Sequence, residues 1–343
     1  MRKLLNTLHV TTPGAYLHRD GETIAIKIEG DTRMRIPVHT IEGLVCWGLV
    51  SCSPPVLALC CENGVGVSYL TDQGRFLARV QGSVSGNVLL RRQQYRTADS
   101  EDATLSIVRS IVTARIANSR IVLLRAAREV SGPDAQKRLR DAADKLSREG
   151  LETMRSLSVD EARGHEGMAG QTYFSVFDDM IVADREAFHF GGRSRRPPRD
   201  RVNALLSFIY ALLRHDVESA LESVGLDPAV GFLHTDRPGR PGLALDIMEE
   251  LRSPLADRLA LTLINRRQVL RDGFIEQDGG GVLLEEATRK TVIAAWQIRK
   301  QDELEHPFLN ERIALGLVPY VQALLMARHL RGGLDSYPAF LSR

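Results

Sequence analysis

The hydrophobic pattern of the chain changes abruptly after about residue 85, and this change constrains the fold more than any other feature of the sequence. Before it, short runs of β-branched and alternating residues are separated by turn residues, as at Thr23 to Ile28, Met34 to Pro37, Val56 to Cys60 and Gly66 to Leu70. Runs of this length and pattern predict the strands of a small β domain with a sandwich-like arrangement.

Beyond about residue 100 the segments become long and repeat with the period of a helix, over 103–127, 133–148, 201–224 and 241–269. One interruption, FIEQDGGGVLL at 274–284, has the turn residues of a hairpin. Between the two patterns, the Gly- and Ser-rich stretch 80–89 favours a linker. We therefore predict an α+β protein: a small N-terminal β-sandwich-like domain (1–85), a linker (86–100) and a larger all-α C-terminal catalytic domain (101–343).

Residues 43–61 carry no charge over nearly the length of a membrane span. The centre of this stretch is Ser53-Pro54-Pro55, and two adjacent prolines interrupt a spanning helix, so we expect two buried strands flanking a turn. The four cysteines all lie between residues 46 and 61 without zinc-ligand spacing, which is typical of reduced thiols. We expect a cytoplasmic protein with no membrane partner.

The positive charge of the chain is supplied almost entirely by arginine. The 45 basic residues exceed the 43 acidic ones by two, and since six of the 45 are Lys, 39 are Arg. A guanidinium group grips a phosphate through two parallel hydrogen bonds, whereas an ammonium acts as a point charge. Arginines cluster in 91–130 and 193–201. These clusters fit a phosphate-binding surface, but a solvated surface in a GC-rich genome explains them equally well.

Common catalytic motifs are absent, and a dispersed set of polar residues remains. The sequence has no GxxxxGK[ST] loop, and Ala169 occupies the second histidine position of an HExxH motif that would begin at His165. The remaining candidates are Glu166, His234 in VGFLHTDRPGRPG, and the two acids of LALDIMEELR, Asp246 and Glu249.

Both acids fall on the face of a helix opposite its apolar residues, with Pro241 in the first turn. Two interpretations stay open: the acids face water, or they line a cleft with Glu166 and His234. Carboxylates and one imidazole are ligands that suit Mg²⁺ or Mn²⁺.

These motifs, in this order, resemble the CRISPR adaptation integrase family, the metal-dependent DNA endonuclease and integrase that inserts spacers into a CRISPR array. The resemblance rests on E-G-x-A followed by Tyr-Phe (166–174), on GFLHTDRPGRPGLALDIMEELR (231–252), on Thr7-Leu8-His9-Val10 and on GNVLLRRQQY (86–95). It covers nearly the whole chain and points to a type I-C-like branch. Two positions depart from the family pattern: Gly242, where many relatives have Ser, and Gly170, where Ala is frequent.

The resemblance implies that Glu166, His234 and Glu249 hold a Mg²⁺ or Mn²⁺ ion, with Asp246 as a further acid important for activity. It also implies a homodimer, a heterohexamer with a small ferredoxin-like partner protein, double-stranded DNA (prespacer and repeat) as the bound nucleic acid, and an iron–sulfur nuclease as an additional partner. We expect phosphate contacts from six arginines: Arg193, Arg195, Arg196, Arg199, Arg237 and Arg240.

The expected reaction is transesterification, in which the 3′-hydroxyl of a DNA fragment attacks a phosphodiester of the repeat. Two alternatives remain: a metal-dependent phosphoesterase acting on small substrates, and a non-catalytic, Arg-rich nucleic-acid-binding scaffold.

Overall fold

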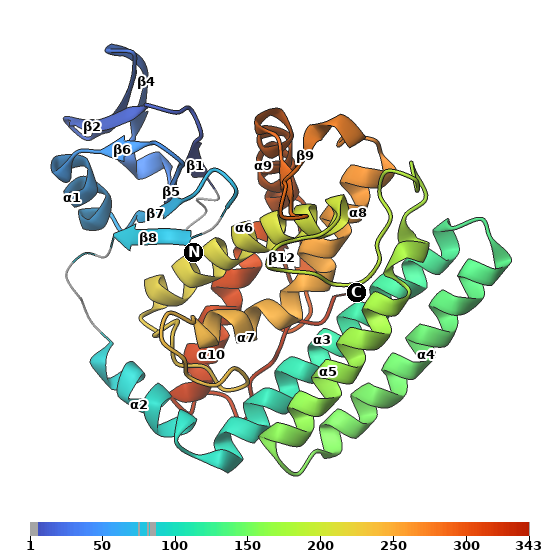
Figure 1. Cartoon of the computed structure of the whole chain (residues 1–343). Coiled ribbons are helices and arrows are strands. Elements are labelled where there is room, and N and C mark those ends of the chain that lie inside the picture. Colours follow the sequence, from blue (N-terminus) through green and yellow to red (C-terminus); the bar gives the residue numbers. More distant parts are fainter. Residues whose placement is uncertain (1–5, 75, 81, 83–86, 343) are drawn as a thin grey trace.

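The N-terminal residues form two four-stranded sheets in a computed structural model of the chain, which describes residues 6–342 except 75, 81 and 83–86 (Figure 1). One sheet has the order β1-β5-β7-β8, in which β8 alone is antiparallel to its neighbour. The other has the order β4-β3-β2-β6. The strands are β1 (Thr7–Val10), β2 (Tyr16–Asp20), β3 (Thr23–Ile28), β4 (Asp31–Pro37), β5 (Gly43–Trp47), β6 (Ser51–Cys52), β7 (Gly66–Leu70) and β8 (Phe76–Val80).

Side chains from both sheets share one apolar core, which includes Leu17 and Ile24 from one sheet and Leu44 and Val67 from the other. The stretch expected to be a second buried strand after residue 53 is instead helix α1 (Pro54–Glu62). The physical reason is local: Ser53 caps the helix by accepting from the Val56 N–H, and the two prolines occupy the first turn, where no backbone N–H donor is needed.

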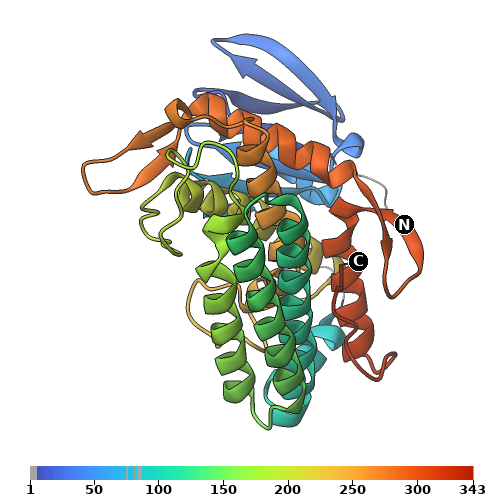
Figure 2. The ribbon, with the colours of Figure 1, turned by 90° about the vertical axis from the view of Figure 1, so that its right-hand side faces the viewer.

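The rest of the chain is mostly helical, and the long helices α3, α4 and α5 lie side by side (Figures 1 and 2). The helices are α2 (Val88–Ala98), α3 (Glu101–Glu129), α4 (Pro133–Arg155), α5 (Val159–Ser175), α6 (Arg201–Val224), α7 (Gly242–Leu251), α8 (Arg258–Asn265), α9 (Glu286–Gln301) and α10 (Val318–Leu330). Helix α6 coincides with the predicted segment, because Asp200 caps its start and Gly225, at φ 92°, ends it. The segment expected as one helix over 241–269 is divided into α7, a π turn (Arg252–Asp257) and α8.

The expectation of an all-α C-terminal domain is wrong in detail. The predicted hairpin is confirmed as β9 (Phe274–Glu276) and β10 (Val282–Leu284), and a second hairpin, β11 (Glu303–His306) and β12 (Glu311–Ala314), follows α9. The second hairpin has no Asn-Gly or Asp-Gly turn, the strongest short-range hairpin signal, to reveal it in the sequence.

The segment expected to be a linker over 86–100 contains helix α2; residue 86 lies outside the described residues. Gln94 fixes α2 to the chain after α6, because its buried amide donates to the carbonyls of Asp227 and Val230 and accepts from the Asp227 N–H. The three hydrogen bonds make α2 part of the helical region. The domain boundaries themselves stay a prediction.

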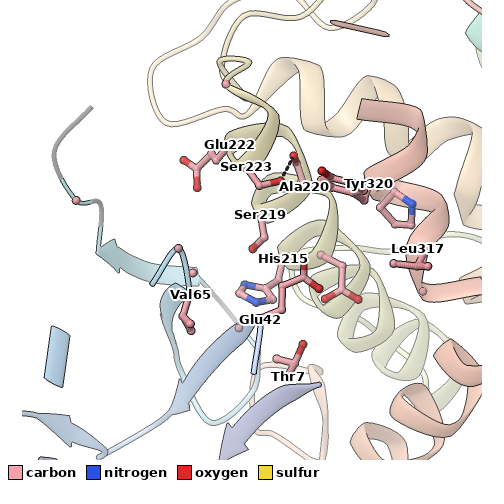
Figure 3. A pocket seen from close by; sticks show the side chains of 18 of the residues that line it. Thr7, Glu42, Val65, His215, Ser219, Ala220, Glu222, Ser223, Leu317 and Tyr320 are labelled. Carbon is pink, nitrogen blue, oxygen red and sulfur yellow. Dashed lines mark hydrogen bonds between the residues drawn. The ribbon is translucent and has the colours of Figure 1, made fainter. Parts of the chain in front are cut away.

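Helix α6 joins the β domain to the helical region along a polar seam. His215 of α6 lies 3.0 Å from the Ser68 hydroxyl of β7, and the Lys300 ammonium contacts both Asp216 (3.0 Å) and Thr7 (3.4 Å). Beside these contacts lies a cavity of about 340 Å³, in which Thr7 and Glu42 face His215 and Ser219 (Figure 3). Over the described part of the chain, no helix has both the length and the apolar character needed to cross a membrane.

Candidate active site

The two acids of α7 are buried. Asp246 is 0% exposed and Glu249 2%, so the first of the two interpretations left open by the sequence, that the acids face water, is wrong. The reason is tertiary: α7 packs against both α3 and α6, and its polar face is covered by α3 and by the loop that precedes α7. A buried charge is costly unless it is hydrogen-bonded or paired, so the partners of these acids determine what the site does.

Asp246 fixes the loop that carries His234. Its carboxylate accepts hydrogen bonds from the backbone N–H groups of Phe232 (2.6 Å), Leu233 (3.0 Å) and His234 (3.0 Å). The loop approaches α7 so closely that a Cβ on Gly242 would lie 2.7 Å from the Ala229 carbonyl oxygen. Gly242 therefore allows a close approach of the two backbones that any side chain at this position would prevent.

The same Asp246 carboxylate orients the His234 ring. Nδ1 of His234 lies 2.7 Å from Asp246 Oδ1. A carboxylate oxygen accepts hydrogen bonds, so Nδ1–H of His234 donates to Asp246 and Nε2 is the ring nitrogen left outside this contact. The side chain of His234 is 18% exposed, and its Nε2 has no hydrogen-bond partner among the described residues. A carboxylate that holds one imidazole nitrogen and leaves the other free is the usual second partner of a metal-binding histidine.

Arg115 of α3 connects the two glutamates. Its guanidinium forms an ion pair with the Glu166 carboxylate of α5, and its Nε lies 2.9 Å from Glu249 Oε2. It also donates to the Glu166 carbonyl at 3.1 Å. A Cβ on Gly170 would lie 3.0 Å from Arg115 Nη2, so the glycine at this second departure from the family pattern leaves room for the guanidinium. Arg252 pairs with the other oxygen of Glu249 at 2.7 Å.

The electrostatics keep Glu249 ionised. Burial raises the pKa of its carboxyl, but Arg252, Arg115 and His234 outweigh that effect, so the net pKa is lower than usual. Glu249 Oε2 lies close to Arg115 Nε, but the two groups are not aligned for a hydrogen bond. This buried oxygen therefore accepts no hydrogen bond from the described residues. Glu249 therefore has the negative charge that a cation would use, and both of its carboxylate oxygens are paired with arginines, Oε2 with Arg115 and Oε1 with Arg252.

The donor types at the site fit a divalent cation, but the ligands are not assembled. Glu166 and Glu249 supply carboxylate oxygens, and His234 supplies a free Nε2. No three His, Cys, Asp or Glu side chains in the described ranges are grouped closely enough to hold a metal ion. Arg115 lies between the two carboxylates and compensates their charge. The structure thus brings the four predicted residues to one place without forming a coordination shell.

The six arginines expected to contact phosphate differ in accessibility. Arg193 is engaged internally: its guanidinium bonds to the Asn203 side chain at 2.6 Å and lies 5.3 Å from the centre of the Tyr210 ring. Burial lowers the pKa of Arg193. The other five are exposed or half-buried: Arg195, Arg196, Arg199, Arg237 and Arg240. Arg195 and Arg196 line a cavity of about 480 Å³ that also contains Arg252, the partner of Glu249.

Arg115 is the site residue that sequence reasoning missed. Its signal was present but weak: in α3 a positive charge interrupts a run of buried apolar side chains that includes Ile111, Val112 and Ile116. A charge in a buried stripe requires a partner from another element. The partners, Glu166 and Glu249, lie 51 and 134 residues further along the chain, so the sequence does not reveal the pairing.

The class of protein follows from a comparison of the fold with solved structures. The structure superposes on a CAS1 protein from Thermotoga maritima with a TM-score of 0.82 and 25% identity, covering 98% of this chain and all of that one. The chain is thus an α+β protein with N-terminal sheets and a mostly helical C-terminal region of the kind found in that structure.

The sequence profile described as "CRISPR associated protein Cas1" matches residues 8–298, and the chain belongs to this family. It is 51% identical over 343 residues to "CRISPR-associated endonuclease Cas1 1" of Chlorobaculum tepidum, with full coverage of both chains. It is also 34% identical over 339 residues to a "CRISPR-associated exonuclease Cas4/endonuclease Cas1 fusion" of Rhodospirillum rubrum, covering 98% of this chain and 57% of the fusion. The family resemblance seen in the sequence is confirmed, and the type I-C-like branch stays a prediction.

Proposed function

We propose that the chain is a DNA endonuclease and CRISPR spacer integrase, which joins the 3′-hydroxyl of a captured DNA fragment to a phosphodiester of the CRISPR repeat. The family supports this function, since the full-length relative at 51% identity is named an endonuclease. The single structural observation that carries it is that the fold brings Glu166, His234 and Glu249 to one place, where the two carboxylates share Arg115 and the His234 Nε2 has no hydrogen-bond partner among the described residues.

Glu166, His234 and Glu249 would hold a divalent ion, Mg²⁺ or Mn²⁺. When bound, the ion supplies Lewis-acid stabilisation of a phosphoryl oxygen and lowers the pKa of the attacking hydroxyl. Asp246 acts as a positioning residue, because it fixes both the 232–234 backbone and the His234 tautomer. Arg115 and Arg252 keep Glu249 ionised.

Duplex DNA, as prespacer and repeat, is the proposed substrate, and the exposed arginines near the site are proposed phosphate contacts. The fusion of a Cas4 exonuclease to a Cas1 endonuclease in Rhodospirillum rubrum supports a nuclease of that kind as a partner. We also retain as proposals the homodimer, the heterohexamer with a ferredoxin-like partner, and the sandwich-like packing of the two sheets, which their shared core supports.

Strand transfer of a short duplex into a supercoiled plasmid bearing the repeat tests the function. We expect joined product with Mn²⁺ or Mg²⁺ and none in EDTA. Glu249→Gln removes the charge of a proposed ligand and should abolish joining, whereas Glu152→Gln, on an exposed side chain of α4, should leave it unchanged. Joining by Glu249→Gln at the wild-type rate would contradict the proposed site.

The same assay separates the two alternatives. A small-substrate phosphoesterase would hydrolyse mononucleotide esters and show no joined plasmid, and a non-catalytic scaffold would retain the duplex without joining it. Either result with the metal-loaded wild-type protein would refute the integrase proposal.

A further inference from the structure

An arginine-rich pocket lies apart from the proposed active site, where the end of α3 meets the start of α8. The pocket has a volume of about 430 Å³ and is lined by Arg125, Arg128 and Glu129 of α3, by Arg258 and by Ser342. Three arginines and one glutamate therefore line the pocket, together with the apolar residues Ile121 and Val122. None of these residues belongs to the set proposed to hold the metal ion.

Arg258 is the most buried of the three arginines that line the pocket. It is half-buried, and no carboxylate of the described residues lies within ion-pair distance of it. The nearby acids have other partners: Glu129 pairs with Arg125 at 3.0 Å and Asp302 with Arg299 at 2.7 Å.

The electrostatics around Arg258 are unfavourable without a ligand. Burial, together with Arg299 and Arg125, lowers the pKa of the Arg258 guanidinium to about 10, and the carboxylates of Glu129 and Asp302 oppose this only in part. A desolvated cation close to two like charges lowers the stability of the folded protein. Such destabilising groups commonly lie at ligand-binding sites, where the bound ligand offsets the loss.

We propose that this pocket binds a backbone phosphate of DNA, with Arg258 as the central contact and Arg125 and Arg128 beside it. A guanidinium offers two parallel donors to a phosphate, which matches the free fork of Arg258. Arg125 and Arg128 lie three residues apart and so share one face of α3, from which both are exposed. The inference rests on the proposed function for the choice of DNA, and it adds a contact outside the reaction centre.

Equilibrium binding of a fluorescent duplex, measured in EDTA over a range of NaCl concentrations, tests the pocket. Each phosphate contact contributes about 0.9 to the slope of log Kd against log salt. Arg258→Gln should lower that slope by about 0.9 and weaken binding about fivefold. The control is Arg33→Gln, at an exposed arginine of β4 on the far side of the molecule from α8 (Figure 1), and it should change neither quantity. An unchanged slope for Arg258→Gln would overturn the proposal.

Thermal unfolding separates a ligand contact from a structural role. Because Arg258 is repelled in the free protein, Arg258→Gln should raise the melting temperature by about 2 °C. A fall of several degrees would show that Arg258 stabilises the fold, and the proposal would be wrong. Inorganic phosphate distinguishes the source of the ligand. If phosphate raised the melting temperature of the wild type but not of Arg258→Gln, while the two proteins had the same DNA salt slope, a small anion would be the ligand and the DNA proposal would be wrong.

The binding readout does not depend on catalysis. If the wild-type protein failed to join DNA but Arg258→Gln still lowered the salt slope, the proposed integrase function would be wrong and DNA binding by the pocket would be supported. If the wild type joined DNA and the slope did not change, the pocket alone would fall.

Discussion

The polar seam at α6 and the proposed active site both contain a histidine and a carboxylate, but the hydrogen-bond partners of these groups differ. At the seam, His215 meets the Ser68 hydroxyl, and Asp216 receives both Lys300 and the Trp296 indole N–H. At the proposed active site, the His234 Nε2 has no hydrogen-bond partner among the described residues, and Glu249 Oε2 lies 2.9 Å from Arg115 Nε without forming a hydrogen bond. Satisfied polar groups stabilise a fold, whereas unsatisfied ones in a partly open site are available to a ligand. On this difference we base the proposal that the His234 cluster, and not the His215 cluster, takes part in chemistry.

The largest expected effect tests that distinction at the active site. His234→Ala should lower strand transfer by about 10³-fold, because several kcal/mol of metal-dependent stabilisation are lost. The affinity for duplex DNA should stay within about twofold, since counterion release from arginine contacts supplies most of it. The control is His189→Ala, at a histidine whose side chain is 72% exposed. Retention of more than about a tenth of the activity would show that His234 belongs with the structural histidines.

The next effect concerns Asp246, which we assign a positioning role. Asp246→Asn should lower activity about 10- to 100-fold and raise the metal concentration needed for half-maximal activity, because the His234 ring loses its fixed tautomer. Excess Mn²⁺ should then recover part of the rate. Asp236→Asn, at an exposed acid of the same loop, is the matched control. Loss of activity with an unchanged metal requirement would contradict this role.

At the seam, the expected effect is on stability and depends on pH. Burial lowers the pKa of His215 below its usual value, and Asp216 opposes this only in part. A depressed histidine pKa gives stability that is complete above about pH 6.5 and is lost as the pH falls, by up to about 1.4 kcal/mol per pH unit. The wild type should therefore lose more unfolding free energy between pH 7.5 and 5.5 than His215→Gln does.

Urea unfolding at both pH values measures this loss, with His39→Gln, at an exposed histidine, as the control. Equal pH dependence in the wild type and His215→Gln would mean that the seam does not hold a neutral imidazole.

The smallest effect compares two arginines of one cluster. Arg193 is held by Asn203 and stacks near Tyr210, so Arg193→Gln should cost about 1–2 kcal/mol of stability and change DNA affinity less than twofold. Arg196 is exposed, so Arg196→Gln should weaken DNA binding about threefold and leave the urea midpoint unchanged. Fluorescence anisotropy and urea titration measure the two quantities. If Arg193→Gln weakened DNA binding and Arg196→Gln lowered stability, Arg193 would be the DNA contact and Arg196 the structural residue.

Local signals made part of the fold predictable. Asp200 and Gly225 mark the ends of α6, and the turn residues of 277–281 mark the first hairpin, so both were predicted from the sequence. Helix α1 was mistaken for a strand because its apolar run is short and the two prolines indicate a turn as well as a helix start. Helix α2 was missed because Gln94, which anchors it, bonds to residues more than 130 positions away.

The candidate residues of the site were predictable, but their environment was not. Helical periodicity placed Asp246 and Glu249 away from the apolar face of α7, and this much is geometric. Whether that face meets water depends on Arg115 of α3 and on the loop before α7, which periodicity within one helix does not report. The identity of the ligand set came from family resemblance rather than from spacing.

The three N–H groups bound by Asp246 have a mechanical consequence. They connect α7 and the 232–234 loop into one structural unit, which carries both His234 and Glu249. Glu166 lies on a separate element, helix α5, and Arg115 connects the two units through its ion pairs with Glu166 and Glu249. If Glu166, His234 and Glu249 hold one cation as proposed, Arg115 has to leave its position between the two carboxylates, or α5 has to shift relative to α7.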